Sequence, residues 1–280
     1  MKLLNIDANA KTVKGQKQGY LTAILYLAPY LASGRNVCAT AKLAGCHHGC
    51  LNTAGRGGIA PRTAIIATDA GNLPDNTIQR ARLARTALYH NDRQVFLAQL
   101  VKELLAFHKR AKRLNLTPVI RLNGTSDIQW ESISIASQWE GDSRALATLM
   151  DNKAGWLQYF GTGTTIFELF PDTQFYDYTK IPNRFDKKLP ANYHLCLSYS
   201  GASPRYVAMV TAALKAHPGI NLIVVADEQT KAGWLASLPN HADGDLSDLR
   251  FLDVPGDVIV LKAKGRARRD TSGFVVRGAI

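Results

Sequence analysis

Three cysteines lie close together near the start of the chain, where Cys38, Cys46 and Cys50 form the pattern C-x7-C-x3-C. Clustered cysteines in a protein that is not secreted bind metal more often than they pair with one another. Zinc takes four ligands in a tetrahedron, and His47 or His48 could supply the fourth. A [4Fe–4S] cluster can instead be held by three thiolates, which leaves one iron open for a further ligand. The spacing alone leaves open a cluster, a zinc ion and three reduced cysteines without metal.

Small residues surround these cysteines, with glycines at positions 45, 49, 55, 57 and 58. Glycine lets the backbone approach a bound group closely, and successive backbone N–H groups can then point at sulfur or phosphate. The short run Gly55-Arg-Gly-Gly58 is a candidate nest of this kind, so Gly57 counts as a candidate cofactor-binding residue. The fourth cysteine, Cys196, stands in an apolar run far along the chain, and we expect it to be a small buried hydrophobic residue.

The composition is that of a globular protein with a strong positive charge. The 280 residues are 46% apolar, and the net charge is +12 with a pI of about 9.6. Such a balance favours polyanionic partners, and we expect a nucleotide or a nucleic acid. The longest apolar run, 20–31, is shorter than the ~20 residues that cross a bilayer. Asp7 and Lys11 also interrupt the place where a signal peptide would be apolar. We therefore expect a cytoplasmic protein that does not enter a membrane.

Short apolar runs recur along the chain, and each ends in polar residues. They are residues 118–122, 174–176, 193–197, 221–226 and 257–261. Helical patterns precede or separate several of them, most clearly over 92–114, which Asp92 could cap, and over 204–216. This rhythm predicts an α/β fold of parallel β/α units that form a partial or full TIM-like barrel. We expect one domain over 1–280, with an N-terminal arm (1–19), a cysteine loop (33–62) and a basic C-terminal segment (262–280).

In folds of this class, function collects at the carboxyl ends of the strands. The polar residues at the ends of the predicted strands are Asn123, Thr125, Asp127, Asp177, Lys180, Ser198, Ser200, Asp227, Lys262 and Lys264. Loops between strands and helices are polar in any protein and must supply helix caps. The signal is therefore the polar character that several independent strand ends share, and not any one residue.

The order of these features resembles the radical S-adenosylmethionine (SAM) enzymes, whose partial β/α barrels hold a [4Fe–4S] cluster by three cysteines and bind SAM at the open iron. The later strands look like those of a bacteriophage protein family with a radical-SAM-like fold. The residues that carry this likeness are Gly124-Thr-Ser-Asp127, Thr179-Lys-Ile-Pro182 with Arg184, and Leu197-Ser198. The resemblance covers about residues 36–265. It departs from the usual radical SAM spacing, C-x3-C-x2-C, in which an aromatic residue stands where this chain has Gly49, and no Gly-Gly-Glu motif is present.

The resemblance implies that Cys38, Cys46 and Cys50 ligate iron and that the strand ends face the cofactor or the substrate. The implied chemistry is reductive cleavage of SAM, followed by removal of a hydrogen atom from a nucleotide or nucleic-acid substrate. Candidate catalytic residues are Asp127, Asp177 and Lys180, since carboxylates at strand ends can do acid–base work. Candidate cofactor-binding residues are Asn123, Thr125, Ser126, Ser198 and Ser200, beside Gly57.

Phosphate recognition is expected from cations at two strand ends and from the basic run KAKGRARR over 262–269. The candidates are Arg121, Lys262, Lys264 and Arg266. A run of this kind that directly follows a strand favours a loop that faces the substrate. The alternative to the radical SAM interpretation is a zinc-stabilised nucleic-acid-binding protein, such as a phage replication or processing factor. A phage protein of either kind would work in the host cytoplasm.

Overall fold

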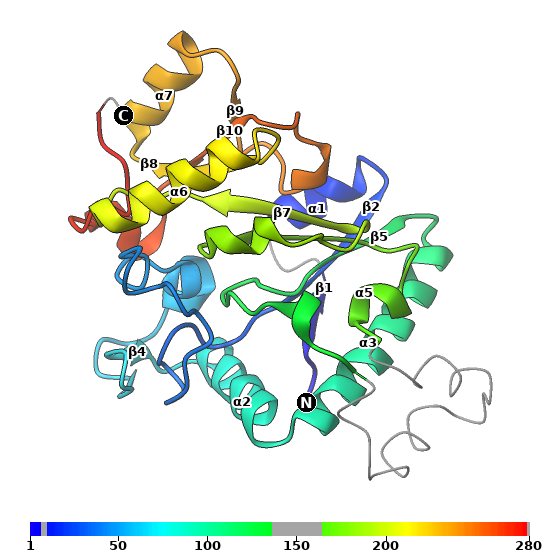
Figure 1. Cartoon of the computed structure of the whole chain (residues 1–280). Helices are drawn as coiled ribbons and strands as arrows, with labels where there is room; N and C mark the ends of the chain where they lie inside the picture. Colours follow the sequence, from blue (N-terminus) through cyan, green and yellow to red (C-terminus); the bar gives the residue numbers. More distant parts are fainter. Residues whose placement is uncertain (7–9, 136–163, 279–280) are drawn as a thin grey trace.

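The computed structural model describes residues 1–6, 10–135 and 164–278. Its centre is an eight-stranded sheet in the order β1-β2-β5-β6-β7-β8-β10-β9, in which only the pair β1 and β2 is antiparallel (Figure 1). Its strands are β1 (Leu4–Ile6), β2 (Tyr20–Leu25), β5 (Thr117–Arg121), β6 (Gln174–Thr179), β7 (Tyr193–Ser198), β8 (Leu222–Ala226), β9 (His241–Asp243) and β10 (Val258–Lys262). A separate two-stranded hairpin pairs β3 (Ile65–Ile66) with β4 (Leu73–Pro74).

The helices are α1 (Ala10–Gln16), α2 (Thr77–Asn91), α3 (Arg93–Arg113), α5 (Ile166–Leu169), α6 (Pro204–Ala216) and α7 (Glu228–Ser237). Short 3-10 turns that matter for the site are η1 (Leu51–Thr53), η2 (Gly55–Gly58), η6 (Pro182–Asp186), η7 (Arg250–Leu252) and η8 (Gly265–Arg269). The predicted class, α/β with parallel β/α units, is confirmed. The segment 1–19, expected to be an arm, contains β1 and α1.

The six parallel strands from β2 to β10 follow one another in chain order, without the reversal that marks a doubly wound sheet. A closed barrel would require the two edge strands to pair. In the described part of the chain β1 and β9 stand at opposite edges, so the sheet is open and a full TIM-like barrel is not formed. The short strand β9 lies beyond β10 and pairs only with it.

One face of the sheet carries the long helices, as the alternation of side chains along β7 shows. Leu195 packs into the core cluster that contains α3, and Leu197 packs into the cluster that contains α6 and α7. Residues two apart on a strand point to the same face, so these helices cover the same side of the sheet. Cys196, between them, packs against Ile223 on the other face. In Figure 1, α2 and α3 lie below the strands while α6 and α7 lie above them. Helices that cover one face of the sheet and yet lie both below and above the strands imply that the sheet curves around that face.

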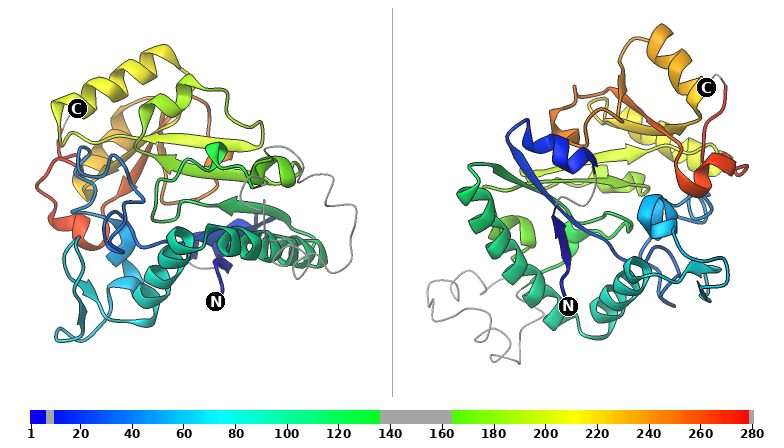
Figure 2. Two further views of the ribbon diagram at one scale, coloured as in Figure 1. Left: turned by 60° about the horizontal axis from the view of Figure 1, so that its bottom comes forward. Right: turned by 180° about the vertical axis from the view of Figure 1, so that it is seen from behind.

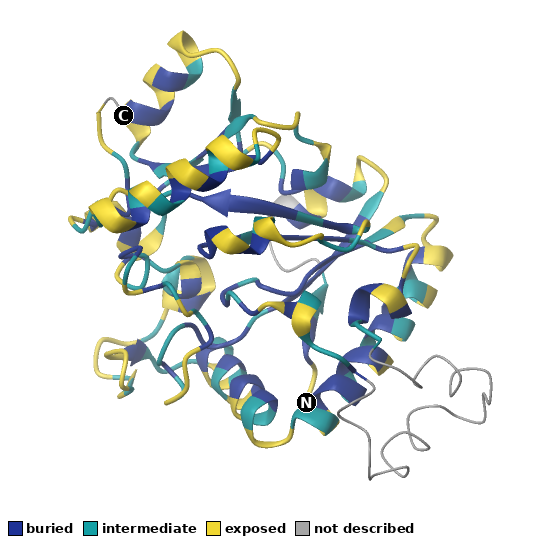
Figure 3. Ribbon diagram, viewed as in Figure 1, coloured by how far each residue is buried: buried dark blue, intermediate teal, exposed yellow. Residues whose placement is uncertain are grey.

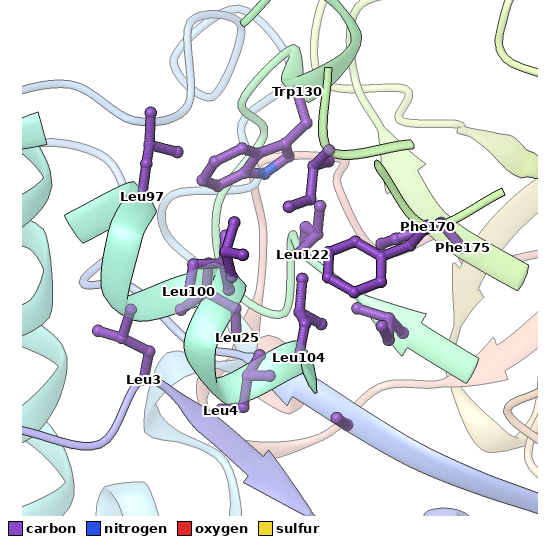
Figure 4. Close-up of a cluster of buried hydrophobic side chains, with 14 of the residues drawn as sticks. Leu3, Leu4, Leu25, Leu97, Leu100, Leu104, Leu122, Trp130, Phe170 and Phe175 are labelled. Carbon is purple, nitrogen blue, oxygen red and sulfur yellow. The ribbon is translucent and has the colours of Figure 1, made fainter. Parts of the chain in front are cut away.

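The larger core cluster forms where α3 packs against β2 and β5 (Figure 4). Asp92 caps α3 as expected, because its carboxylate accepts the Val95 N–H at 3.0 Å. Leu97, Leu100 and Leu104 recur at helical spacing and are fully or almost fully buried. Burial of each such side chain stabilises the fold by about 1.5–3 kcal/mol. This packing fixes β5, and with it the polar residues that follow the strand.

The second helix that positions the site is α6, whose bounds agree with the predicted helix. The Ser203 hydroxyl accepts the Tyr206 N–H, and Pro204 occupies the first turn, where its missing N–H is not needed. Burial alternates along α6, with an exposed stripe away from β7, while β7 itself is buried except at His194 (Figure 3). Among the described residues, no helix is long and apolar enough to cross a membrane.

Candidate functional site at the carboxyl ends of the strands

A cavity of about 220 Å³ lies at the carboxyl ends of the parallel strands. The arrow of β7 points towards this end of the molecule, where the cysteine loop and the C-terminal segment meet (Figures 1 and 2). The structure brings together in the cavity wall the predicted site residues Cys38, Cys46, Cys50, Arg121, Asn123, Thr125, Ser126, Asp127, Lys180, Ser198, Lys262 and Lys264. Residues from four strand ends and from the loop after β2 thus share one wall.

Four predicted site residues lie outside the cavity wall. Asp177 is fully buried beside it, where its carboxylate accepts the Asn123 N–H at 2.8 Å. The Ser200 hydroxyl donates to the Ala44 carbonyl at 2.6 Å and so fastens the cysteine loop to the end of β7. Gly57 is buried against α2, and Arg266 reaches away to the Asn72 carbonyl at 3.0 Å.

The three thiols of the cavity are half-buried and lie in an apolar setting. Cys38 accepts the Tyr30 N–H at 3.4 Å and donates to the Thr125 carbonyl at 3.8 Å, which joins the loop to the turn after β5. Burial raises the pKa of each thiol, and it raises that of Cys46 to about 12 although Lys180 opposes the shift. These thiols are protonated at neutral pH unless a metal stabilises the thiolates, since metal binding releases the thiol protons.

Metal ligands are not assembled into a site in the part of the chain that the structure describes. Within the described ranges, no three His, Cys, Asp or Glu side chains converge closely enough to hold one metal ion. The His47 ring is also engaged, because its Nδ1 lies 3.0 Å from the Ala41 carbonyl.

Contacts with the C-terminal segment hold the cysteine loop in place. A Cβ on Gly49 would lie 2.8 Å from the ring of Phe274, so only glycine allows the loop to approach this closely. Gly45 has a φ of +64°, and a Cβ there would meet Ala202 at 2.7 Å. Phe274 and Ala267 line the cavity beside the cysteines. The sequence did not identify Phe274, because nothing local to the C-terminal segment shows that it folds over a loop more than 200 residues away.

The turn after β5 is built around the side chain of Asn123. Its Oδ1 accepts the Ser126 hydroxyl at 2.9 Å and the Trp130 indole N–H at 3.3 Å, and its Nδ2 donates to Ile128. The Thr125 hydroxyl donates to the Leu27 carbonyl at 2.6 Å. These polar side chains are therefore used to shape the turn. The backbone of the turn contacts the cysteine loop through the Thr125 carbonyl.

Asp127 fixes the end of β6 against this turn. Its carboxylate accepts the Thr179 hydroxyl at 2.8 Å, the backbone N–H of Lys180 at 2.7 Å and the Arg184 guanidinium at 3.1 Å. Arg184 also donates to both carboxylate oxygens of Glu131, at 2.9 and 2.6 Å. Burial raises the pKa of Asp127, and the charge of Arg184 works against that shift. The sequence did not identify Glu131 as part of this group.

Lys180 is the buried amine of the cavity. Its ammonium donates to the carbonyls of Tyr199, at 2.7 Å, and Ser198, at 3.1 Å, and lies 4.9 Å from the centre of the Phe274 ring. Burial lowers its pKa to about 8, although Cys46 and Asp127 favour the charged form. An amine with a pKa this close to neutral can give or take a proton at physiological pH.

Each of the other cavity cations has a carboxylate partner. Arg121 donates to Asp248 at 3.2 Å, and Lys264 donates to Asp245 at 2.7 Å. Lys262 pairs with Glu228. Both Asp245 and Asp248 line the cavity, and sequence reasoning missed them. The density of acidic residues over 243–248, D-G-D-L-S-D, is the signal that could have found them.

The titration of Asp177 predicts a pH-dependent stability. Burial raises its pKa from 3.8 to about 7, while Arg121 and the Asn123 N–H oppose the shift. The folded state therefore holds a proton between about pH 4 and pH 7 that the unfolded chain has released, so the free energy of unfolding falls as the pH rises through this window. The fall attributable to this carboxyl is at most about 4 kcal/mol, at about 1.4 kcal/mol per pKa unit.

Urea unfolding of wild type and of Asp177→Asn at pH 5 and pH 8 measures this contribution. Asparagine keeps an acceptor for the Asn123 N–H but does not titrate. The loss of stability between the two pH values is expected to be smaller in the variant. An equal loss in both proteins would assign the pH dependence to other groups.

The chain was compared with curated proteins, solved structures and protein families. No curated protein and no solved structure matches the chain. The model of one protein family, described as gene product 88, matches residues 1–278. This match fits the resemblance to a phage family and carries no statement about iron, SAM or nucleic acid. The chain belongs to the gene product 88 family.

Proposed function

We propose that this protein is a [4Fe–4S] enzyme of the radical SAM type that acts on a nucleotide or nucleic-acid substrate. The observation that carries the proposal is the position of the three cysteines. They follow β2, the first of six parallel strands in chain order, and all three line one cavity at the carboxyl ends of those strands. A cofactor held there would face the strand ends, where β/α folds place their active sites.

The order of the strands in the sheet supports this proposal. Sequential parallel strands with long helices on one face of an open sheet are compatible with the partial β/α barrel that the proposal requires. The other face carries Arg121 and Tyr178 into the cavity. The Arg121 guanidinium stacks 4.5 Å from the centre of the Tyr178 ring.

The residues of the chain would divide the work as follows. Cys38, Cys46 and Cys50 would hold the cluster, which would supply the electron for reductive cleavage of the cosubstrate. The charge of Lys180 lowers the pKa of the Cys46 thiol and so favours the thiolate that a metal requires. Asp127 holds the backbone of Lys180 in place. The apolar wall and Phe274 would lower the access of water to the cofactor.

The substrate class rests on charge. A net charge of +12 favours a polyanion such as a nucleotide or a nucleic acid.

Cleavage of SAM tests the reaction type. The protein, purified without oxygen and reduced with dithionite, is expected to convert SAM to 5′-deoxyadenosine and methionine, as followed by liquid chromatography. Formation of these products must depend on the reductant. Protein that carries a full complement of iron but yields no 5′-deoxyadenosine would exclude the radical SAM mechanism while leaving the cluster in place.

A further inference from the structure

The cations that line the cavity are compensated, whereas a group of arginines at its edge is not. The arginine rim consists of Arg56, Arg266, Arg268 and Arg269, all of them exposed. Over the ranges that the structure describes, none of the four forms an ion pair with a carboxylate, although Arg268 lies near enough to Glu228 to affect its pKa. Positive charge that lacks a partner within the protein is available to an external anion.

The rim is continuous with the cavity, because η8 packs against the cysteine loop. A Cβ on Gly265 would lie 3.1 Å from Cα of Ala54, which joins η1 to η2. Ala267, between Arg266 and Arg268, lines the cavity, and so does Leu51 at the start of η1. The Arg266 guanidinium donates to the Asn72 carbonyl, which ties the rim to the β3–β4 hairpin.

We propose that the arginine rim binds the phosphate backbone of a single-stranded nucleic acid, one nucleotide of which enters the cavity. The cavity of about 220 Å³ is far too small for a duplex, so only an unpaired base could reach into it. Enzymes that act on a base take it out of the stack or use single strands. Leu51 is 52% exposed at the entrance and offers an apolar surface against which a base can pack. The inference rests on the proposed function for the reaction in the cavity, but the binding surface can be tested without it.

Fluorescence anisotropy of the full-length protein with labelled single strands of DNA and of RNA, roughly 20 nucleotides long, tests the rim. Affinity for at least one of the two is expected to fall steeply between about 50 and 200 mM salt. The variant Arg266→Ala/Arg268→Ala/Arg269→Ala is expected to bind at least about tenfold more weakly at low salt. Its salt slope should fall by about 2, at ~0.7 for each phosphate that the variant no longer neutralises.

The matched control is Lys109→Ala/Lys112→Ala/Arg113→Ala, which removes the same charge from exposed positions near the end of α3. It is expected to bind within twofold of wild type. Equal weakening in both triple variants would show that binding depends on net charge alone and would overturn the role of the rim. Tighter binding of duplex DNA than of single strands would overturn the single-strand assignment. Iron content and SAM cleavage are measured on the same wild-type protein. A protein that holds the cluster but does not bind oligonucleotides would overturn only the proposed role of the arginine rim. A protein that binds oligonucleotides but holds no cluster would overturn only the proposed function.

Discussion

Alanine at Cys38, Cys46 or Cys50 is expected to remove most of the iron from the protein. Wild type purified without oxygen should be brown, with about four irons per chain and a visible sulfur-to-iron absorbance. The three thiols lie in the same cavity wall, and burial raises the pKa of each. Without a metal they therefore stay protonated at neutral pH. Removal of one of three ligands leaves a cluster with two protein thiolates, and we expect it to dissociate during purification. Iron and sulfide analysis, with the visible spectrum, measures the effect.

Cys196→Ala is the matched control, because it removes the fourth thiol without touching the cavity. Cys196 is fully buried in β7 and packs against Ile223 and Ile259. Its iron content is expected to equal that of wild type. A colourless wild-type protein with one zinc per chain would exclude the cluster and favour a zinc-stabilised binding protein. Protein free of both metals would leave the three cysteines as reduced structural residues.

Much of the fold could be predicted from local pattern. The apolar runs that end in polar residues became β5, β6, β7, β8 and β10, and the helix over 204–216 was correct at both ends. These elements are encoded by burial on both faces of a strand or by a helical stripe. The short edge elements β1, α1 and β9 carry little apolar periodicity and were missed. Whether a sheet closes depends on its curvature and on its edges, which no local pattern records.

The candidate site shows the same limit. Sequence reasoning placed most of the strand ends that line the cavity, because carboxyl ends of parallel strands meet at one edge of the sheet. It could not predict which polar side chains already have hydrogen-bond or ion-pair partners within the fold. Asn123 looked available for a cofactor, yet its side chain shapes the turn around Ser126 and Trp130. Arg121 and Lys264 looked like phosphate ligands, yet each has a carboxylate partner from the segment after β9. Such pairings join residues more than a hundred positions apart or separated by a strand.

Arg184→Met is expected to destabilise the protein by about 3–5 kcal/mol, the usual result of breaking a buried ion pair by removing one partner. The Arg184 side chain is completely buried and bonds to Asp127, to both oxygens of Glu131 and to the Tyr193 hydroxyl. Methionine matches much of the aliphatic stem but removes the guanidinium that Asp127 and Glu131 share. Urea unfolding followed by circular dichroism, compared at constant m-value, measures the change.

The pH dependence of this destabilisation separates charge from packing. Without Arg184, the pKa of Asp127 should rise further above its ordinary value, because burial is its largest cause and the guanidinium is the largest opposing one. The folded variant would then retain a proton that the unfolded chain releases, so the loss of unfolding free energy relative to wild type should shrink as the pH falls from 8 towards 5.

Arg80→Met is the matched control, since Arg80 pairs with Asp75 at an exposed position and its replacement should cost far less stability. A deficit that does not change with pH would point to poorer packing, and a deficit no larger than that of Arg80→Met would show that the group around Asp127 does not hold the end of β6. If the charge group does hold it, the variant should also misplace Lys180, whose backbone N–H depends on Asp127, and so couple stability to the geometry of the cavity.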